Sequence, residues 1–273
     1  MGATRRHQGG RTMTYRNLIF EKADQVAVLR LNRPDAFNAA DIGLFEDLIK
    51  ALEACTVDDE VKVVVITGEG KAFCAGGDLA MFTTFPDPGE GIRQLTKRFH
   101  FVISGIRRIP KPVIAMVNGT AAGGGFSLAV ACDLRICASS AKFKQAYTSS
   151  GLVPDGAWTL LVPLLVGFGK ASELAYLDPV FDAKEALAMG LVNRVVEDGE
   201  LERETRRVAS QLARGATRSY AIVKENFNNA ILGLLERTLE MEREGIIRAG
   251  KTKDAKEGIS AFMERRRPAF IGA

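Results

Sequence analysis

The pattern of apolar and polar positions along the chain predicts a series of strands and helices. Two short alternating runs, at 18–20 and 26–29, stand on either side of a polar break and predict a β-hairpin. Apolar residues recur every three or four positions across 40–55, which predicts an amphipathic helix. The segment 61–67 contains a continuous Val-Val-Val-Ile run, which is typical of a strand buried on both faces of a parallel sheet.

The order of helix, strand and glycine turn then returns, with a helix at 92–109 and a strand at 113–117. This repetition predicts an α/β fold with a parallel sheet. A further strand is expected at 134–137, and from residue 201 the pattern is helical. One helix in this last part has a strongly apolar face, which is typical of a helix buried against a partner. That face is formed by Ile231, Leu232, Leu234, Leu235 and Leu239.

Length and composition favour one sizeable core. The chain has 273 residues, of which 47% are hydrophobic, and nothing in the pattern requires two independent domains. We divide it into a tail at 1–16, a core at 17–200 and a helical region at 201–273. The tail is polar, lacks the apolar stretch of a signal peptide and is expected to be disordered; Met13 could equally begin the chain.

The positive charge belongs to the tail. The net charge is +4, and four arginines precede the first acidic residue, Glu21. Subtracting these four charges leaves a nearly neutral body, which argues against nucleic-acid binding. The four are Arg5, Arg6, Arg11 and Arg16.

Other function classes are disfavoured by what the chain lacks. No run of about 18 apolar residues is present, so no membrane span is expected. The four cysteines show no CxxC spacing and are expected to be buried thiols in a cytoplasm-like compartment. The histidines are His7, in the tail, and His100, on a helix. Two such residues argue against a Ser-His-Asp triad and against a metal bound by histidines. We therefore expect no metal site and a chemistry based on carboxylates and backbone groups.

Two glycine-rich junctions are the candidate functional elements. After the strand at 113–117 and the Asn118-Gly119 turn, three glycines at 123–125 open a helix of small residues. The first N–H groups of such a helix have no partner within it and suit an oxygen that carries negative charge. A similar junction at 75–79 follows the strand at 61–67. Two N–H groups facing each other would form an oxyanion hole, although each junction taken alone is better explained as a packing turn, because Gly-rich turns are common.

The two junctions together resemble a known family. The motifs ITGEGKAFCAGGDLAMF and, some forty residues on, IPKPVIAMVNGTAAGGGFSLAVACDLRICASSAKF resemble the crotonase (enoyl-CoA hydratase/isomerase) superfamily, and the likeness extends over 18–270. The resemblance implies a ClpP-like spiral of ββα units with a C-terminal helical region that forms trimers, often paired into hexamers. It implies an acyl-CoA thioester as substrate, with no cofactor besides the coenzyme A of that substrate. It assigns the two oxyanion N–H groups to Gly77 and Gly124.

The resemblance also assigns residues to substrate binding. The loop at 32–38 would line the CoA nucleotide and pantetheine through Ala36 and Phe37. Asp35 stands where many relatives carry a basic residue, so the phosphate contact from this loop is open. At the first junction, the substrate would be contacted by Ala75, Asp78 and Leu79.

Cationic and C-terminal residues complete this set. Lys71 is a candidate for the CoA phosphates. Phe262 and Arg265 match residues that cover adenine and approach the 3′-phosphate from a neighbouring subunit, although a run of three arginines before Pro268 is also typical of a solvated helix end. The Pro- and Gly-rich loop at 81–91 is either a mobile flap over the acyl pocket or a plain surface loop.

The acid or base is assigned by comparison with the family. Hydratases of the family use two glutamates, and their positions here hold Ser127 and Tyr147, neither of which is a base at neutral pH. Asp155, in GLVPDGAWTLLVPLLVG, matches the catalytic acid/base of the isomerase branch that acts on ring-epoxidised phenylacetyl-CoA. It also matches the second acid of dienoyl-CoA isomerases and the nucleophile of aromatic acyl-CoA dehalogenases. Taken alone, Asp155 could be a helix N-cap.

We therefore predict an enoyl-CoA isomerase in which Gly77 and Gly124 bind an enolate oxygen and Asp155 moves a proton. Tyr147 either donates to the acyl group or lines the pocket. Hydration with water held by Asp155 and Ser127 is the first alternative, and thioester hydrolysis or displacement on an aromatic ring is the second. A non-catalytic CoA-ester binder remains a further alternative, whereas an RNA-binding relative would need interleaved basic and aromatic residues.

Overall fold

The structure is a computed structural model that describes residues 15–86 and 88–273. The predicted disorder of the tail at 1–16 falls almost wholly outside these residues, as do His7 and Met13. The predicted flap at 81–91 includes residue 87, which is also outside them.

A six-stranded sheet, in the order β1-β2-β3-β5-β7-β10, forms the centre of the fold. The first two strands are the predicted antiparallel hairpin, with Asp24 and Gln25 at positive φ in its turn. All other neighbours in the sheet are parallel, as predicted. The strands are β1 (Leu18–Ala23), β2 (Val26–Leu31), β3 (Val63–Gly68), β5 (Val113–Val117), β7 (Leu134–Ala138) and β10 (Arg194–Val196).

Both faces of this sheet are covered, which explains the continuous apolar runs. Every residue of β3 and β5 is buried. One face packs in the main core, and the other packs on α8 (Leu201–Ala213), which contributes Leu201, Val208 and Ala209. The helical region that begins at 201 therefore supplies part of the core of its own chain.

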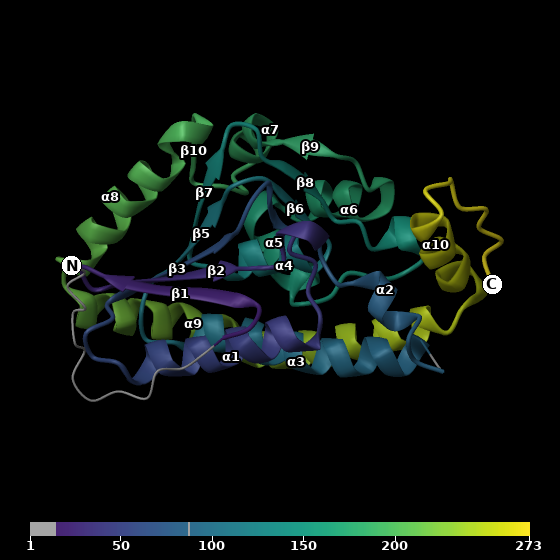
Figure 1. Cartoon of the computed structure of the whole chain (residues 1–273), viewed down its shortest axis with the longest axis horizontal. Helices are drawn as coiled ribbons and strands as arrows, with labels where there is room; N and C mark the ends of the chain where they lie inside the picture. The colour runs from purple at the N-terminus through teal and green to yellow at the C-terminus, as the bar shows by residue number, and fades with distance from the viewer. Residues whose placement is uncertain (1–14, 87) are drawn as a thin grey trace, which may run out of the picture.

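A second sheet, in the order β4-β6-β8-β9, lies beyond the ends of the first (Figure 1). Its strands are short, and the first three each follow a main strand directly before the chain enters a helix. This is the repeating ββα unit that the resemblance implies. The pattern of apolar residues did not predict these strands, because two or three residues are too few to show a period of two. They are β4 (Ala72–Cys74), β6 (Thr120–Ala122), β8 (Lys142–Lys144) and β9 (Phe181–Asp182).

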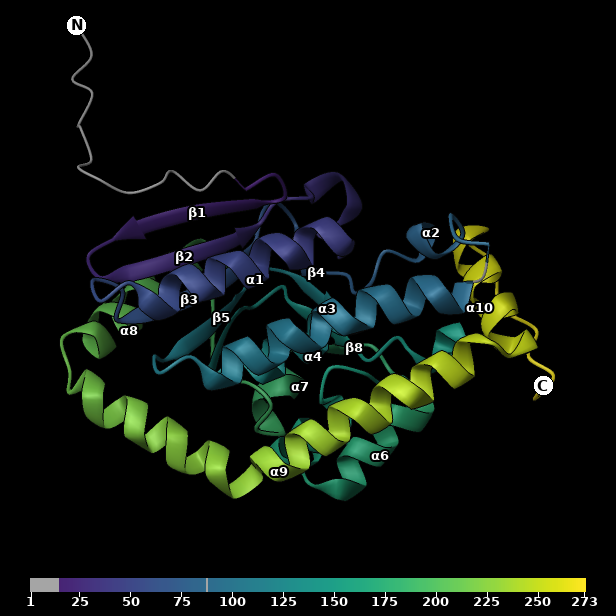
Figure 2. The ribbon, with the colours of Figure 1, turned by 90° about the horizontal axis from the view of Figure 1, so that it is seen from below.

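Three helices run side by side along one side of the sheets (Figure 2). Helix α1 (Ile42–Val57) begins where the Asp41 carboxylate accepts the Leu44 N–H at 2.8 Å, and it packs on α3 (Pro88–Arg108). Helix α9 (Thr217–Gly250) packs on the other side of α3. Helices α1 and α3 were both predicted, with boundaries that differ by a few residues.

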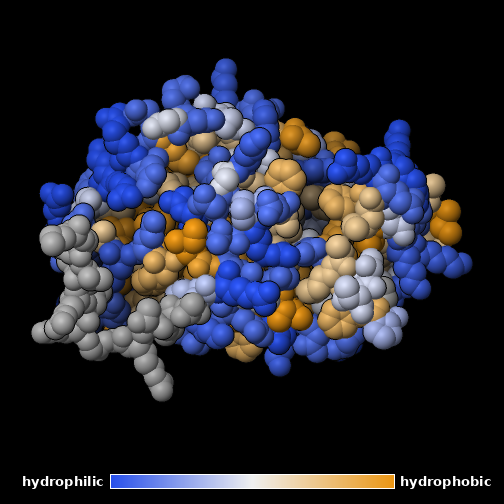
Figure 3. Space-filling model, viewed as in Figure 1, coloured by the Kyte–Doolittle hydropathy of each residue, from blue (hydrophilic) through white to orange (hydrophobic). Residues whose placement is uncertain are grey.

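Two of the remaining helices, α4 (Gly124–Ala131) and α7 (Ala183–Ala188), contact strands of the second sheet. Helix α4 is the predicted glycine-led helix, and α10 (Lys253–Met263) contacts α2 and η2 at the C-terminal end of the molecule. Apolar side chains gather at this end (Figure 3), among them the exposed Phe262, Met263 and Ile271. The others are η1 (Pro34–Ala36), α2 (Leu79–Phe82), η2 (Thr148–Ser150), α5 (Trp158–Val166), α6 (Phe168–Leu177) and η3 (Asp198–Glu200).

The predicted apolar face of α9 divides into two parts. Leu235 and Leu239 are buried in the core of the same chain, whereas Leu234 is 54% exposed. The side chains of Ile231 and Leu232 lie outside the description. Phe227 and Met241, on the same helix, are also exposed.

Two further expectations concern the whole chain. The four cysteines are buried free thiols, as predicted. Within the described residues, no helix is both long enough and apolar enough to cross a bilayer.

Candidate active site

The first glycine corner follows β4, at residues 75–77. Gly76 has φ +106°, and a Cβ on it would lie 3.0 Å from the Ala122 carbonyl oxygen, so the corner needs glycine. The chain is tied at both sides of this turn. The Ala75 N–H donates to the Phe37 carbonyl at 3.1 Å, and the Gly76 carbonyl accepts the Ala40 N–H at 2.7 Å.

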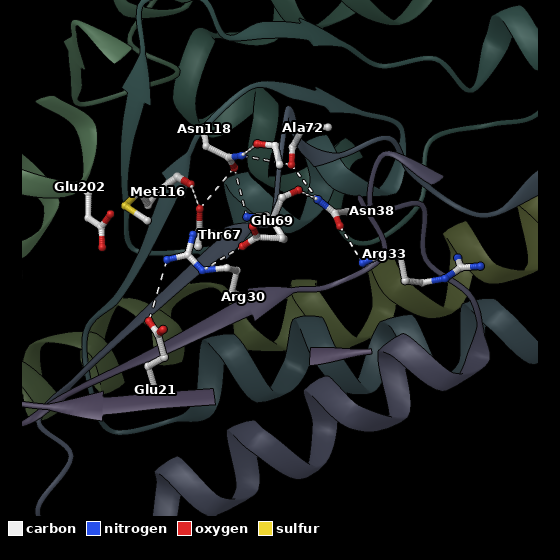
Figure 4. Close-up of polar contacts among 12 residues, drawn as sticks. Glu21, Arg30, Arg33, Asn38, Thr67, Glu69, Ala72, Met116, Asn118 and Glu202 are labelled. Carbon is white, nitrogen blue, oxygen red and sulfur yellow. Dashed lines mark hydrogen bonds and ion pairs between the residues drawn. The ribbon is translucent and has the colours of Figure 1, made fainter. Parts of the chain in front are cut away.

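Two asparagines hold the loop that leads into this corner (Figure 4). Asn38, which is fully buried, donates from Nδ2 to the Glu69 and Ala72 carbonyl oxygens at 2.9 and 2.8 Å. Asn118 donates to the Gly70 carbonyl at 2.9 Å and accepts the Gly68 N–H at 3.1 Å. These bonds satisfy backbone groups that the turn leaves unpaired and so fix where β4 begins.

The second corner is the start of α4. Gly123 has φ +51° and donates its N–H to the Lys144 carbonyl at 3.1 Å. A Cβ on Gly125 would lie 2.0 Å from the Cys74 carbonyl oxygen, which shows how closely α4 packs on β4. This contact brings the second corner against the first.

The two amides are neighbours in space. A Cβ built on Gly124 would lie 3.8 Å from the backbone nitrogen of Gly77, and both residues line one cavity. Within residues 15–86 and 88–273, neither N–H has a hydrogen-bond acceptor. Two unsatisfied donors therefore lie close together on one cavity, as an oxyanion hole requires.

The cavity beside these amides is mainly apolar. Its volume is about 100 Å³, several times the roughly 10–15 Å³ that one water molecule needs. Its walls include residues of α2, α3, α9 and α10. The apolar lining includes Phe45, Leu79, Phe82, Ile92, Leu95, Phe99, Leu152, Ile246 and Phe262.

Asp155 is buried at the edge of the cavity and is held by a histidine. Its Oδ1 lies 2.6 Å from Nε2 of His100, on α3. No hydrogen-bond partner of Oδ2 is found in the described part of the chain, and Asp155 lines the cavity. One carboxylate oxygen is thus fixed by His100 and the other is available to a substrate.

The expectation that the chemistry would rest on carboxylates and backbone alone is therefore incomplete. His100 is 55 residues from Asp155, and the sequence placed it on a helix without a partner. The one available signal was its spacing on α3. His100 follows Thr96 by four residues and Phe99 by one, and both of those residues line the cavity.

Ser127 and Tyr147 hold the backbone of Asp155. Their hydroxyl groups lie 2.6 and 3.1 Å from the Asp155 carbonyl oxygen and 3.0 Å from each other. Burial, together with the negative charge of Asp155, raises the pKa of Tyr147 well above its ordinary value. Tyr147 is therefore a hydrogen-bond donor here and not a base.

A second carboxyl group, that of Glu242, lies near Asp155. Glu242, on α9, is buried and accepts the Ala157 N–H at 2.6 Å and the Thr159 N–H at 2.8 Å. Burial, and then the charge of Asp155, raise the pKa of Glu242 to about 8. The sequence analysis missed Glu242, which lies 85 residues from Ala157 and in a helix rich in glutamate.

Only part of the predicted binding set gathers at the cavity. Its lining includes Ala75, Gly77, Leu79, Gly124, Tyr147, Asp155 and Phe262. Phe262 reaches this cavity within its own chain, whereas the resemblance implies a contact with the substrate of a neighbouring subunit. Phe82, at the start of the loop predicted as a flap, also lines the cavity.

The other predicted binding residues lie outside the lining. Ala36 and Phe37 stand beside the first corner, where Phe37 is 59% exposed and its carbonyl binds Ala75. Asp78 pairs with Arg33 at 3.0 Å. Lys71 is exposed before β4, and Arg265 is exposed after α10.

No group of three or more metal-binding side chains occurs in the described ranges. The polar groups that line the cavity are instead the two amides, the Asp155 carboxylate that His100 holds, and the hydroxyls of Thr96, Tyr147 and Ser150. This set can bind a developing negative charge and move a proton next to it.

The chain is similar to proteins of one family along nearly its whole length. The family profile described as enoyl-CoA hydratase/isomerase matches residues 21–273. A crotonyl-CoA hydratase of Syntrophomonas wolfei is 37% identical over 260 residues, which cover 95% of this chain and 99% of the relative. A 1,2-epoxyphenylacetyl-CoA isomerase of Escherichia coli is 35% identical over 249 residues, which cover 90% and 95%.

Solved structures agree. The crystal structure of an enoyl-CoA hydratase from Mycobacterium avium subsp. paratuberculosis has a TM-score of 0.86 at 34% identity, covering 94% of this chain and 100% of that one. These likenesses confirm the crotonase fold that the two motifs imply, and the relatives include both a hydratase and an isomerase. With a matching profile, sequence and fold, the chain belongs to the enoyl-CoA hydratase/isomerase family.

Proposed function

We propose that the protein is an enoyl-CoA isomerase that moves a double bond within an acyl-CoA thioester. The observation that carries the proposal is the buried carboxylate of Asp155, the one carboxylate among the described residues that line the cavity together with the unsatisfied amides of Gly77 and Gly124. No cofactor is required besides the coenzyme A of the substrate.

In this mechanism, the two amides bind the thioester oxygen and stabilise the enolate that forms when a proton leaves the acyl chain. One donor of this kind contributes about 3–4 kcal/mol in measured oxyanion holes. Oδ2 of Asp155 accepts the proton from one carbon and returns it to another, so the double bond shifts and no atom is gained or lost. Because the cavity is small and apolar, it excludes most of the water that would otherwise screen these interactions.

His100 completes the acid/base group. With Nε2 protonated, it donates to Oδ1 and leaves Oδ2 as the oxygen that faces the substrate. We assign this tautomer from the geometry, since Oδ1 has no other donor among the described residues.

Hydration is disfavoured by the same geometry. The two positions that hold glutamates in hydratases hold Ser127 and Tyr147, and both hydroxyls are engaged with the Asp155 carbonyl. A hydratase would need a water held by two acid/base groups, whereas this cavity contains one carboxylate among its lining residues.

Binding of the CoA part is proposed to involve residues outside the cavity. The loop with Ala36 and Phe37 would contact the nucleotide and pantetheine, and Lys71 and Arg265 would approach the phosphates. Trimers, or hexamers made of two trimers, would cover the exposed apolar side chains of α9, including Phe227 and Met241.

The proposal is tested with purified protein and a panel of trans-2-enoyl-, 3-enoyl-, dienoyl- and aryl-CoA thioesters. Interconversion of 2-enoyl and 3-enoyl esters is expected, with turnover falling by about 10³-fold or more in Asp155→Asn while the Kd for the ester changes little. Loss of conjugated absorbance with a 3-hydroxy product and no 3-enoyl product would show hydration instead.

The His100–Asp155 pair favours one second candidate, hydrolytic displacement on an aromatic acyl-CoA. A carboxylate nucleophile beside a base is a common arrangement for covalent catalysis. Oδ2 would attack a ring carbon and expel halide, and a water deprotonated by His100 would then hydrolyse the aryl ester. Halide release from a haloaryl-CoA, absent in Asp155→Asn, would identify this activity.

A further inference from the structure

The backbone that follows Asp155 is held in an unfavourable conformation. Gly156 and Ala157 have φ of +74° and +62°, both in the left-handed region. A Cβ on Gly156 would lie 2.3 Å from the ring of Phe99, so only glycine fits there. Ala157 is fully buried, and its Cβ disfavours the left-handed conformation that it adopts. Such a turn persists only where neighbouring groups hold it.

Glu242 is the group that holds this turn from one side. Its Oε2 accepts the Ala157 N–H at 2.6 Å, and its Oε1 accepts both the N–H, at 2.8 Å, and the hydroxyl of Thr159. Ala157 precedes α5 at the position where a serine or aspartate would cap a helix, and it has no side chain that can do so. A carboxyl group from α9 therefore takes the place of the missing cap and satisfies N–H groups of the first turn.

The same turn is held from the opposite side by hydroxyl groups. Ser127 and Tyr147 donate to the carbonyl oxygen of Asp155, two residues before the amide that Glu242 binds. The peptides between Asp155 and Ala157 are thus fixed at both ends. The direction of the Asp155 side chain, toward His100 and the cavity, depends on these two attachments.

Helix α9 is well placed to carry this group. It packs on α3, which bears His100, and on α5, which Glu242 caps. Ile246, one helical turn after Glu242, lines the cavity itself. Glu242 therefore joins the helix that closes the cavity to the turn that carries the acid/base residue.

We propose that Glu242 is a positioning residue, which fixes the turn at 155–157 so that Oδ2 of Asp155 points at the substrate carbon while Oδ1 stays on His100. The kinetic part of this inference rests on the proposed isomerase function. Glu242 touches neither the substrate nor the reacting atoms, and it acts only through Asp155.

The kinetic test compares Glu242→Gln with Glu244→Gln, a glutamate two residues away on the same helix that is exposed. A glutamine side chain carries an NH2 group in place of one of the two carboxyl oxygens, so at that position a donor would face the N–H that Glu242 now accepts, and the turn should relax. A misplacement of about 1 Å can cost about 10²-fold in rate, so we expect kcat to fall by about 10- to 100-fold with KM within about twofold. Glu244→Gln should match the wild type.

A second readout does not depend on the reaction. In a His7→Gln background, His100 is the only histidine of the chain, so its imidazole ¹⁵N signals are directly assigned. The Nε2 chemical shift reports the hydrogen bond to Asp155. It should change in Glu242→Gln and stay constant in Glu244→Gln.

The outcomes separate the two proposals. The positioning role would be overturned by any of three results in Glu242→Gln. These are a wild-type kcat, a change in KM alone, and a lower kcat with an unchanged His100 signal. If the wild type isomerises no ester, the proposed function fails and the His100 signal alone decides the role of Glu242. If Glu242→Gln does not fold, Thr159→Val decides by the same readouts, because it removes one bond to Glu242 and keeps both backbone bonds. We expect about a 3- to 10-fold loss of kcat in Thr159→Val.

Discussion

The two glycine corners and the Asp155 turn share one cavity but are built differently. The corners take their geometry mainly from backbone conformation and backbone hydrogen bonds, at Gly76, at Gly123 and between β4 and β6. Asp155 is held instead by side chains from α3, α4 and α9 and by Tyr147, which are 8 to 87 residues away in the chain. The anion-binding half is thus mainly a product of backbone conformation, and the acid/base half is a product of packing.

This difference predicts that the corners tolerate almost no change of backbone. Gly124→Pro removes one of the two amide donors, while proline suits the first position of a helix. Loss of a single oxyanion donor costs about 10²- to 10³-fold in kcat, and we expect a loss of that size with a nearly unchanged melting temperature. A variant that unfolds would show that the corner matters for stability, and one with full turnover would remove Gly124 from the mechanism.

The loop before the first corner should be sensitive in stability. Asn38→Ala removes the side-chain donor to the Glu69 carbonyl oxygen, leaves the Ala72 carbonyl with the longer bond from Asn118 alone of its two asparagine donors, and places alanine at φ +57°. A buried polar group that loses its hydrogen-bond partner costs about 1–3 kcal/mol, so the free energy of unfolding should fall by roughly 2–4 kcal/mol. Urea denaturation measures this effect, with Asn229→Ala on the exposed side of α9 as the control.

The Asp155 turn should respond to side-chain chemistry in graded steps. His100→Leu removes the donor to Oδ1, which should lower kcat by about 10- to 100-fold because charge-assisted hydrogen bonds contribute about 1.5–3 kcal/mol. His100→Gln keeps an amide donor and should recover part of this loss. Steady-state kinetics on the same ester measure both variants, and equal activity in the two would mean that the hydrogen bond has no catalytic effect.

The buried Glu242 should make the stability of the protein depend on pH, with a modest change at each pH unit. Its pKa is raised in the folded protein from 4.5 to about 8, by burial and by Asp155. The folded state thus keeps a proton that the unfolded state releases above about 4.5, and the free energy of unfolding should fall as pH rises from 4.5 to 8. The slope is at most about 1.4 kcal/mol per pH unit.

Denaturation at pH 5.5 and 7.5 checks this sign. Glu242→Gln should lose the part of the slope that comes from Glu242, whatever its absolute stability, because glutamine does not titrate. Asp155 and Tyr147 also face this carboxyl, so Asp155→Asn should reduce the slope by removing the charge that raises the pKa of Glu242. An unchanged slope in both variants would mean that Glu242 is ionised in the folded protein throughout this range.

What the sequence determined by itself was local. Periodicity located the hairpin, α1, α3 and the parallel strands, because burial on one or two faces leaves a repeat of fixed length in the chain. The glycines at 76, 77 and 123–125 could be singled out because only glycine allows such turns and such close approach. The family motifs contain these same glycines.

Only the tertiary structure decided which side chains meet. Three contacts join residues that lie 55 or more positions apart, or elements with no shared period. They are the pairing of His100 with Asp155, the cap that Glu242 supplies to α5, and the contact of Phe262 with the cavity of its own chain. Contacts of this kind leave no repeat in the sequence. They follow from how α3, α9 and α10 pack around the sheets, which is a property of the whole fold.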